Sequence, residues 1–240
     1  MKLNSEKEQG NYTKMYYTKA RLFPTLLTVI PLCFLIYRIG VWFFGANIEM
    51  MLRVIIWSGY FTVSAALLFL MVQINRLIAK EVFQRFYFQD EINMPTTNHL
   101  LWKDRFLNEQ VKNKIRSKIN EKFNLQLMSP SEEKNNEPEA RKLIVSAVAA
   151  VRNSLRGNKL LLQHNIEYGF FRNLLGGCLP AILFSILTIV FGYTTSDHYA
   201  IIVGCLLALA YFCMILSGKF FMKRFGHYYS KILYEQFLTE

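Results

Sequence analysis

The sequence of 240 residues has little of what marks a soluble enzyme. Its four cysteines form no CxxC pair and its four histidines are scattered, which argues against a disulfide framework and a metal site. No phosphate-binding glycine loop, HExxH pair or GxSxG elbow is present, so the commonest signatures of nucleotide hydrolysis, metalloproteolysis and ester hydrolysis are missing. The sequence therefore predicts a protein that is not an enzyme and that requires no cofactor.

Acidic residues are also scarce, with 17 Asp and Glu against 28 Lys and Arg, and the formal net charge is +11. The apolar residues make up 52% of the chain and are separated from the charges along it. A helix that crosses a bilayer needs about 20 predominantly apolar residues. Such stretches predict an all-α membrane protein with four transmembrane helices in two hairpins, at residues 22–44, 54–74, 173–196 and 198–218.

The first of these stretches is the least regular, because Pro24, Pro31 and Arg38 interrupt it. Proline is tolerated in membrane helices where neighbouring helices satisfy the freed carbonyl. We expect the Arg38 side chain to extend to the membrane interface, with a place at a pore mouth as the alternative. The residues before this span lack the apolar region of a signal peptide, so we expect the span to be retained.

Lysine and arginine are concentrated outside the two short links within the hairpins. The positive-inside rule then places both termini and the long segment between the hairpins in the cytoplasm. The predicted organisation is an N-terminal segment, a first hairpin, a helical cytoplasmic insert, a second hairpin and an amphipathic tail, at residues 1–21, 22–74, 75–172, 173–218 and 219–240. We expect the tail to lie on the membrane surface or to dock on the insert.

Helical periodicity continues through the insert without any alternating strand pattern. The second span is expected to extend from about Leu52 to Phe88. Residues 99–123 are predicted to form an amphipathic helix with lysines and arginines on its polar side, and residues 138–163 a further helix. An insert this small is expected to pack on the extended second helix and on other copies of itself.

The predicted 138–163 helix carries a narrow basic face. At 100° per residue its cationic side chains lie within about 60° of one another; they are Arg141, Arg152, Arg156 and Lys159. Arginine suits bidentate contact with phosphate, so this face is a candidate binding site for a nucleotide or a short oligonucleotide. A solvated helix face and contact with anionic lipid headgroups are the alternatives.

Two further sets of residues are candidates for conduction and its control. Polar side chains of the second span, Thr62, Gln73 and Asn75, are candidates for lining a path between subunits, although helix packing also explains them. At the junction before the third span, Glu167 and Arg172 are candidates for a polar latch, with interfacial anchoring as the alternative. Gly176 and Gly177 follow, and they would permit a bend there.

Two segments carry a resemblance to a known family: NMPTTNHLLWKD at residues 93–104 and NIEYGFFRNLLGG at residues 165–177. Together with a helical insert between transmembrane hairpins, they resemble the small bacterial membrane effectors encoded beside nucleotidyltransferases in anti-phage defence, such as those of Hailong systems. The resemblance covers about half of the chain.

The resemblance implies an oligomeric ion channel that is controlled by a nucleotide signal and whose opening depolarises an infected cell. We expect it in the bacterial inner membrane as a homo-oligomer, for example a tetramer. Its implied partners are other copies of the chain, the lipid bilayer, a nucleotide or short oligonucleotide second messenger, and a nucleotidyltransferase encoded nearby. The competing interpretation is a non-conducting membrane anchor or sensor that recruits a cytosolic partner. A small enzyme that acts on lipid is the least favoured.

Overall fold

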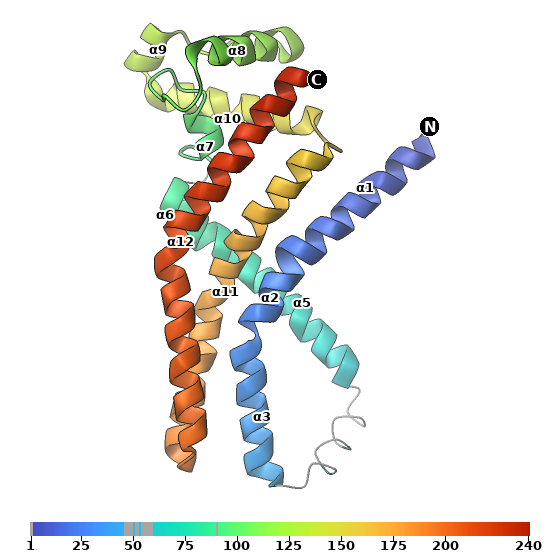
Figure 1. Ribbon diagram of the computed structural model, residues 1–240, viewed down its shortest axis with the longest axis vertical. Coiled ribbons are helices and arrows are strands. Elements are labelled where there is room, and N and C mark those ends of the chain that lie inside the picture. Colours follow the sequence, from blue (N-terminus) through green and yellow to red (C-terminus); the bar gives the residue numbers. More distant parts are fainter. Residues whose placement is uncertain (1, 46–49, 51–52, 54–59, 90) are drawn as a thin grey trace. The chain divides into compact units, whose positions relative to one another are not determined.

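The computed structural model describes residues 2–45, 50, 53, 60–89 and 91–240, and the regular elements among them are all helices (Figure 1). This confirms the all-helical prediction. In chain order the elements are α1 (Lys2–Tyr17), η1 (Thr18–Leu22), α2 (Phe23–Thr28), α3 (Ile30–Phe44), α5 (Tyr60–Ile78), η2 (Ala79–Gln84), α6 (Arg85–Phe88), α7 (Pro95–Asn98), α8 (Glu109–Phe123), α9 (Pro130–Asn135), α10 (Glu137–Ser154), α11 (Lys159–Thr195) and α12 (His198–Thr239); η1 and η2 are π-helical.

The chain forms two compact units. One consists of residues 1–17, 84–169 and 220–240 and is called the head unit below. The other consists of residues 18–83 and 170–219 and is called the span unit. Both α11 and α12 contribute residues to each unit.

Three helical stretches are long and apolar enough to cross a membrane, at Gly10–Phe44, Lys159–Thr195 and His198–Thr239. They contain the predicted first, third and fourth spans, which supports a membrane protein. The predicted second span at 54–74 begins outside the described residues, and its described part lies in α5. Which side of a membrane each end faces stays a prediction.

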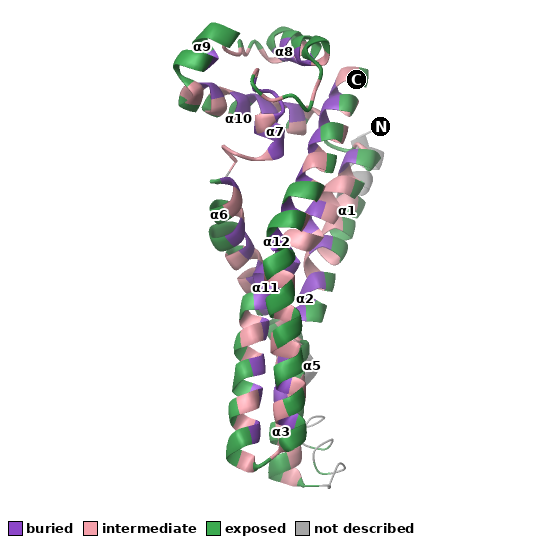
Figure 2. Cartoon of the chain, turned by 60° about the vertical axis from the view of Figure 1, so that its left-hand side comes forward, coloured by how far each residue is buried: buried purple, intermediate pink, exposed green. Residues whose placement is uncertain are grey.

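The span unit leaves large apolar side chains exposed along α3, α11 and α12 (Figure 2). Leu206, Phe212 and Leu216 on α12, for example, are more than half exposed. Such a surface is unfavourable in water, whereas lipid chains or other apolar helices cover it without penalty. The exposed residues therefore fit the membrane setting that the hydropathy indicates.

The predicted second hairpin is formed by α11 and α12, which lie side by side in both ribbon views (Figures 1 and 2). Small residues allow the close approach, because a Cβ atom on Gly204 would lie 2.7 Å from Ile189 Cγ1. The hydroxyls of Ser185 and Thr188 donate to carbonyls of the preceding helical turn. Hydroxyls bonded in this way leave no unsatisfied donor on an apolar helix.

Arg38, which we expect at the membrane interface, forms an ion pair with Asp197. Its Nε donates to Asp197 Oδ2 over 2.7 Å, and its Nη2 contacts the same oxygen. Its guanidinium carbon also lies 5.6 Å from the ring centroid of Tyr199. Asp197 is in the link between α11 and α12, so this contact ties α3 to the second hairpin.

The head unit has its own apolar core, and α12 contributes its C-terminal part to that core. Leu233, Tyr234 and Phe237 of α12 are fully buried among side chains of α8 and α10. Of the two arrangements expected for residues 219–240, the structure therefore shows docking on the insert. The docked tail is the final part of one continuous 42-residue helix.

The boundaries of two helices in the insert differ from the predicted ones. The helix expected at 99–123 begins at Glu109, because Asn108 caps it by accepting a bond from Gln110 N over 2.9 Å. The prediction of one helix over residues 138–163 is wrong in its C-terminal part, because α10 ends at Ser154 and a separate helix, α11, begins at Lys159. The predicted basic face is therefore divided between two helices and the turn that joins them.

Two cations of the predicted polar side of residues 99–123 are buried instead. Lys112 Nζ donates to Leu101 O over 2.7 Å and also contacts Asp104 O. Arg116 donates to Leu100 O over 2.7 Å and forms a 3.1 Å ion pair with buried Glu133. Residues 99–108 form no long helix, so their carbonyls need donors from elsewhere, and these two side chains supply them.

A buried imidazole joins α7 to α12. His99 is fully buried, its Nε2 lies 2.8 Å from His227 Nδ1, and its Nδ1 lies 2.8 Å from Ser230 Oγ. Burial is the main cause that lowers the pKa of His99 to about 4. The charges of His227 and Lys112 lower this pKa further, and the charge of Asp104 opposes them.

Stability of the head unit should therefore fall as the pH is lowered below about 6.5. The unfolded chain takes up the His99 proton as the pH falls through about 6.5, whereas the folded chain takes it up only near pH 4, so stability falls across the window between these two values. Each unit of this window costs about 1.4 kcal/mol. Unfolding of the purified protein at pH 7.5 and pH 5 measures the loss, and His99→Asn should lose less between the two. Equal losses would contradict this role of His99.

Candidate anion-binding site

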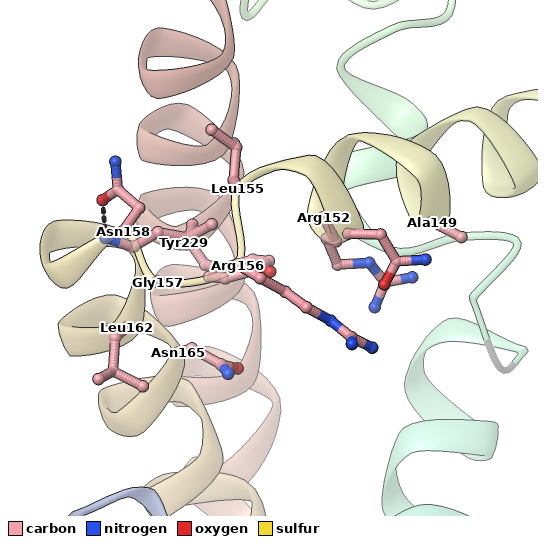
Figure 3. A pocket seen from close by; sticks show the side chains of 11 residues that line it. Ala149, Arg152, Leu155, Arg156, Gly157, Asn158, Leu162, Asn165 and Tyr229 are labelled. Carbon is pink, nitrogen blue, oxygen red and sulfur yellow. Dashed lines mark hydrogen bonds between the residues drawn. The ribbon is translucent and has the colours of Figure 1, made fainter. Parts of the chain in front are cut away.

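A cavity of about 380 Å³ lies in the head unit at the turn between α10 and α11 (Figure 3). Its polar lining combines two cations, three amides and a phenol, and it is completed by apolar side chains of the same turn and of α11. The polar residues are Arg152, Asn153, Arg156, Asn158, Asn165 and Tyr229.

The turn that shapes this cavity follows from its sequence, LRGN at residues 155–158. Leu155 is buried in the head core and ends α10, and Gly157 has a φ of +96°, which side chains rarely allow. Asn158 then caps α11, because its Oδ1 accepts from Leu161 N over 2.9 Å. Its amide nitrogen also donates to Gln236 Oε1 on α12 over 2.7 Å, which fixes the start of α11.

Arg152 is held in place from the opposite side by a carboxylate. Its Nη2 donates to Glu91 Oε2 over 2.7 Å and its Nη1 to Glu91 Oε1 over 3.5 Å. Burial lowers the pKa of Arg152, but the hydrogen bond to Glu91 and its charge outweigh this, and the pKa is raised. The Nε atom is buried without a hydrogen-bond partner among the described residues. Arg152 thus stays cationic and has an unused donor.

Arg156 is the second cation of the cavity, and it is exposed. Among the residues that the structure describes, none forms an ion pair with its side chain. In Figure 3 the guanidinium groups of Arg152 and Arg156 both extend away from the α10–α11 turn, and Asn165 of α11 points toward the same space. Two arginines beside the positive end of a long helix favour a negative charge, so this cavity is a candidate site for an anion.

Only two of the four residues of the predicted basic face line this cavity. Arg141 is occupied elsewhere on α10, where it donates to Glu137 Oε1 over 2.8 Å, Ile92 O over 2.9 Å and Asn98 Oδ1 over 2.7 Å. Lys159 is the exposed first residue of α11 and is not part of the lining. Their part in ligand binding stays a prediction, as does that of Arg152 and Arg156.

Other polar residues of the site carry weaker sequence signals. Glu91 lies 61 residues before its partner, and Tyr229 belongs to a tail in which many aromatics have the spacing of a membrane interface. The sequence around Asn158 does indicate its role, because an asparagine that follows a glycine between two helical patterns is typical of a helix cap.

The junction residues lie on one uninterrupted helix, α11. Glu167 is in the head unit, where its recorded partners belong to the same helix: His164 Nδ1 at 3.2 Å and Gln163 Nε2 at 3.5 Å. Arg172 is in the span unit and has contacts of its own. Whether the two residues act as a latch stays a prediction.

Gly176 and Gly177 do not interrupt α11, and they allow it to approach two other helices of the span unit. A Cβ atom on Gly176 would lie 2.7 Å from Ala79 N, and one on Gly177 would lie 2.6 Å from Asn75 Nδ2 and against the Thr28 hydroxyl. The present structure therefore uses both glycines for close helix packing. A bend at these positions stays a prediction.

Asn75 is fully buried beneath these glycines. Its Nδ2 donates to Thr28 Oγ1 over 2.9 Å and to Thr25 Oγ1 over 3.2 Å. Both hydroxyls donate in turn to backbone carbonyls, so they must accept from the amide, and this fixes its orientation. The Oδ1 atom then has no partner among the described residues.

Gln73 and Thr62 are the other two residues predicted to line a path between subunits. Gln73 is partly exposed in a surface groove of α5 and η2, beside Arg76 and Lys80. The side chain of Thr62 lies outside what the structure describes. The pore-lining roles of Thr62, Gln73 and Asn75 stay predictions.

Comparison of the chain with family models, with curated proteins and with solved structures finds no match. The cavity, the helices and the motifs of this chain are therefore what indicates its function.

Proposed function

We propose that the chain is a subunit of an oligomeric membrane ion channel that is controlled by an anionic nucleotide or oligonucleotide. One observation carries the proposal above the others. The cavity that holds Arg152 and Arg156 opens at the first turn of α11, and the same helix contains an apolar stretch long enough to cross a membrane.

The chemistry of the cavity supports a ligand with a phosphate group. Guanidinium groups bind phosphate oxygens through paired, charge-assisted hydrogen bonds. Asn153 and Asn165 offer amide donors and acceptors of the kind that contact a base or a ribose. The volume of about 380 Å³ is near the lower end of the range for small-molecule sites, and it suits one nucleotide unit. A longer oligonucleotide would extend beyond the cavity.

Control of conduction requires that the ligand bind one state of the protein more tightly than another. Residues 159–165 at the cavity and residues 173–195 of the span unit belong to one helix. A change in the tilt or rotation of α11 on ligand binding would therefore reach the span unit through a continuous helix. This is the physical route by which the proposed ligand controls the channel.

Several copies are needed for a path across the membrane. One chain contributes few helices, and its polar span residue Asn75 is buried within the chain. The exposed apolar faces of α3, α11 and α12 provide area for other copies as well as for lipid. We propose a homo-oligomer, for example a tetramer, assembled through such faces.

The biological setting follows from the resemblance of residues 93–104 and 165–177 to anti-phage membrane effectors. In that setting the protein lies in the bacterial inner membrane with both termini and the insert in the cytoplasm. A nucleotidyltransferase encoded nearby supplies the signal, and opening of the channel dissipates the membrane potential of the infected cell.

A membrane anchor or sensor without conduction is the second candidate. The burial of Asn75 favours it, because the best placed polar side chain of the second span faces its own helices in this structure. Ion flux from liposomes that contain the purified protein separates the two candidates. A channel changes its ion flux when its ligand is added, whereas an anchor leaves the ion gradient unchanged.

A further inference from the structure

Glu91 faces the cavity cation Arg152 in the structure. Its two carboxylate oxygens lie 2.7 Å and 3.5 Å from the two terminal nitrogens of the guanidinium. This is close to the fork-like geometry in which a guanidinium binds a carboxylate or a phosphate. The edge of Arg152 that a phosphate would use is therefore occupied by a group of the same chain.

The segment that carries Glu91 is fastened at several points. Arg141 donates to Ile92 O and to Asn98 Oδ1, and Thr97 Oγ1 donates to Glu91 O over 2.7 Å. Two arginines of α10 thus hold residues 91–98: Arg141 through the Ile92 carbonyl and the Asn98 side chain, and Arg152 through the Glu91 side chain. The bonds from Arg141 and Thr97 do not involve the Glu91 carboxylate, so they hold this segment whether or not the carboxylate is paired with Arg152.

The pair between Glu91 and Arg152 is accessible to an incoming anion. The side chains of Arg152 and Glu91 are 34% and 39% exposed, in contrast to the buried pair of Arg116 and Glu133 in the same unit. An ion pair with this exposure is weak, because water screens it. A phosphate with two negative charges, held also by Arg156, is a stronger partner for the same guanidinium.

We propose that Glu91 is an internal competitor for the anionic ligand of this cavity. The ligand phosphate displaces the carboxylate from Arg152, and Glu91 returns when the ligand leaves. This inference rests on the proposed ligand site and adds its regulation. The carboxylate sets the ligand concentration at which the site fills, and its release frees a side chain of the segment that follows α6.

Binding of inorganic pyrophosphate to the full-length protein in detergent micelles at pH 7.5 tests the proposal. Glu91→Gln keeps the size of the side chain but removes its charge, so we expect about 3- to 10-fold tighter binding than in the wild type. The matched control is Glu139→Gln, which removes the exposed partner of Lys142 on α10 and should leave the affinity unchanged. Melting temperatures without pyrophosphate show that each variant is folded, and Glu91→Ala repeats the test.

The outcomes separate the two levels of the proposal. Tighter binding in Glu91→Gln alone supports the competitor. Equal affinity in the wild type and Glu91→Gln, with binding lost in Arg152→Gln, overturns the competitor but leaves the ligand site in place. Weaker binding in Glu91→Gln also overturns it, because Glu91 would then orient Arg152 for the ligand. Absence of binding in every variant overturns the ligand site itself.

Discussion

Replacing Arg152 with glutamine and Arg156 with glutamate in one protein should weaken the binding of a phosphate-bearing ligand at least about 100-fold. Each arginine supplies hydrogen bonds to a charged group, which are worth about 1.5–3 kcal/mol apiece. Loss of both, with a negative charge added at position 156, removes the cations of the cavity lining. The fold should survive, because Arg156 is exposed and Arg152 is partly exposed.

Titration of the full-length protein with pyrophosphate measures this effect. The control is Lys142→Glu, which changes the charge of α10 by the same sign at a side chain that is 65% exposed and outside the cavity. We expect the control to change the affinity by less than about threefold, since an exposed charge at a distance is screened by salt. A similar loss in both proteins would mean that the net charge of the head unit, and not this cavity, determines binding.

Gly176→Ala should disrupt the packing of the span unit. The added methyl group would lie 2.7 Å from Ala79 N and 2.8 Å from Ala79 Cβ, and it would also collide with Asn75 O. Two of these three atoms belong to the backbone of another helical stretch, so no side-chain rotation relieves the overlap. Overpacking of this kind costs about 1–3 kcal/mol and more where the backbone must move.

Thermal unfolding in detergent micelles, followed by circular dichroism, measures this loss. Gly10→Ala is the matched control, because a Cβ atom at Gly10 in α1 meets nothing within 4 Å. Alanine is the better helix former by about 0.5–1 kcal/mol, so the control should leave stability unchanged or raise it. Equal melting temperatures for Gly176→Ala and the wild type would show that α11 does not depend on this close approach.

Hydropathy was sufficient for the coarse fold. Apolar length alone places the spans at 22–44 and 198–218, and all of 173–196 except its last residue, inside helical stretches of the structure. Helical periodicity in the insert agrees with the absence of strands from the described residues. Hydropathy did not predict the junction between the insert and the third span. One helix, α11, begins at Lys159 and continues through the junction, and no break in the sequence marks the membrane edge. Continuous helix formers on both sides hide such a boundary.

The turn at residues 155–158 interrupts the single helix that the apolar periodicity predicts over residues 138–163. Its glycine and asparagine are the usual signals for the end of one helix and the cap of the next. The apolar period continues through Leu155 and obscured them. The structure divides the predicted basic face that contains Arg152 and Arg156, but both residues line the cavity.

The remaining polar contacts depend on distant parts of the chain. The burial of Lys112 and Arg116 follows from carbonyls near Leu100 that lack helical partners, and a basic helix face gives no sign of it. The pairing of Glu91 with Arg152, and of Arg38 with Asp197, joins residues 61 and 159 positions apart. A single sequence does not specify such contacts, because they depend on how helices pack.

Ion flux from proteoliposomes shows whether a nucleotide controls conduction through this protein. Purified wild-type protein is reconstituted with a potassium gradient, and linear and cyclic mono- and dinucleotides of adenine and guanine are added at the face that exposes the head unit. We expect that one of these ligands changes the flux in the wild type and that Arg152→Gln with Arg156→Glu abolishes the change. Absence of flux with every nucleotide, or an equal response in the double variant, would contradict it.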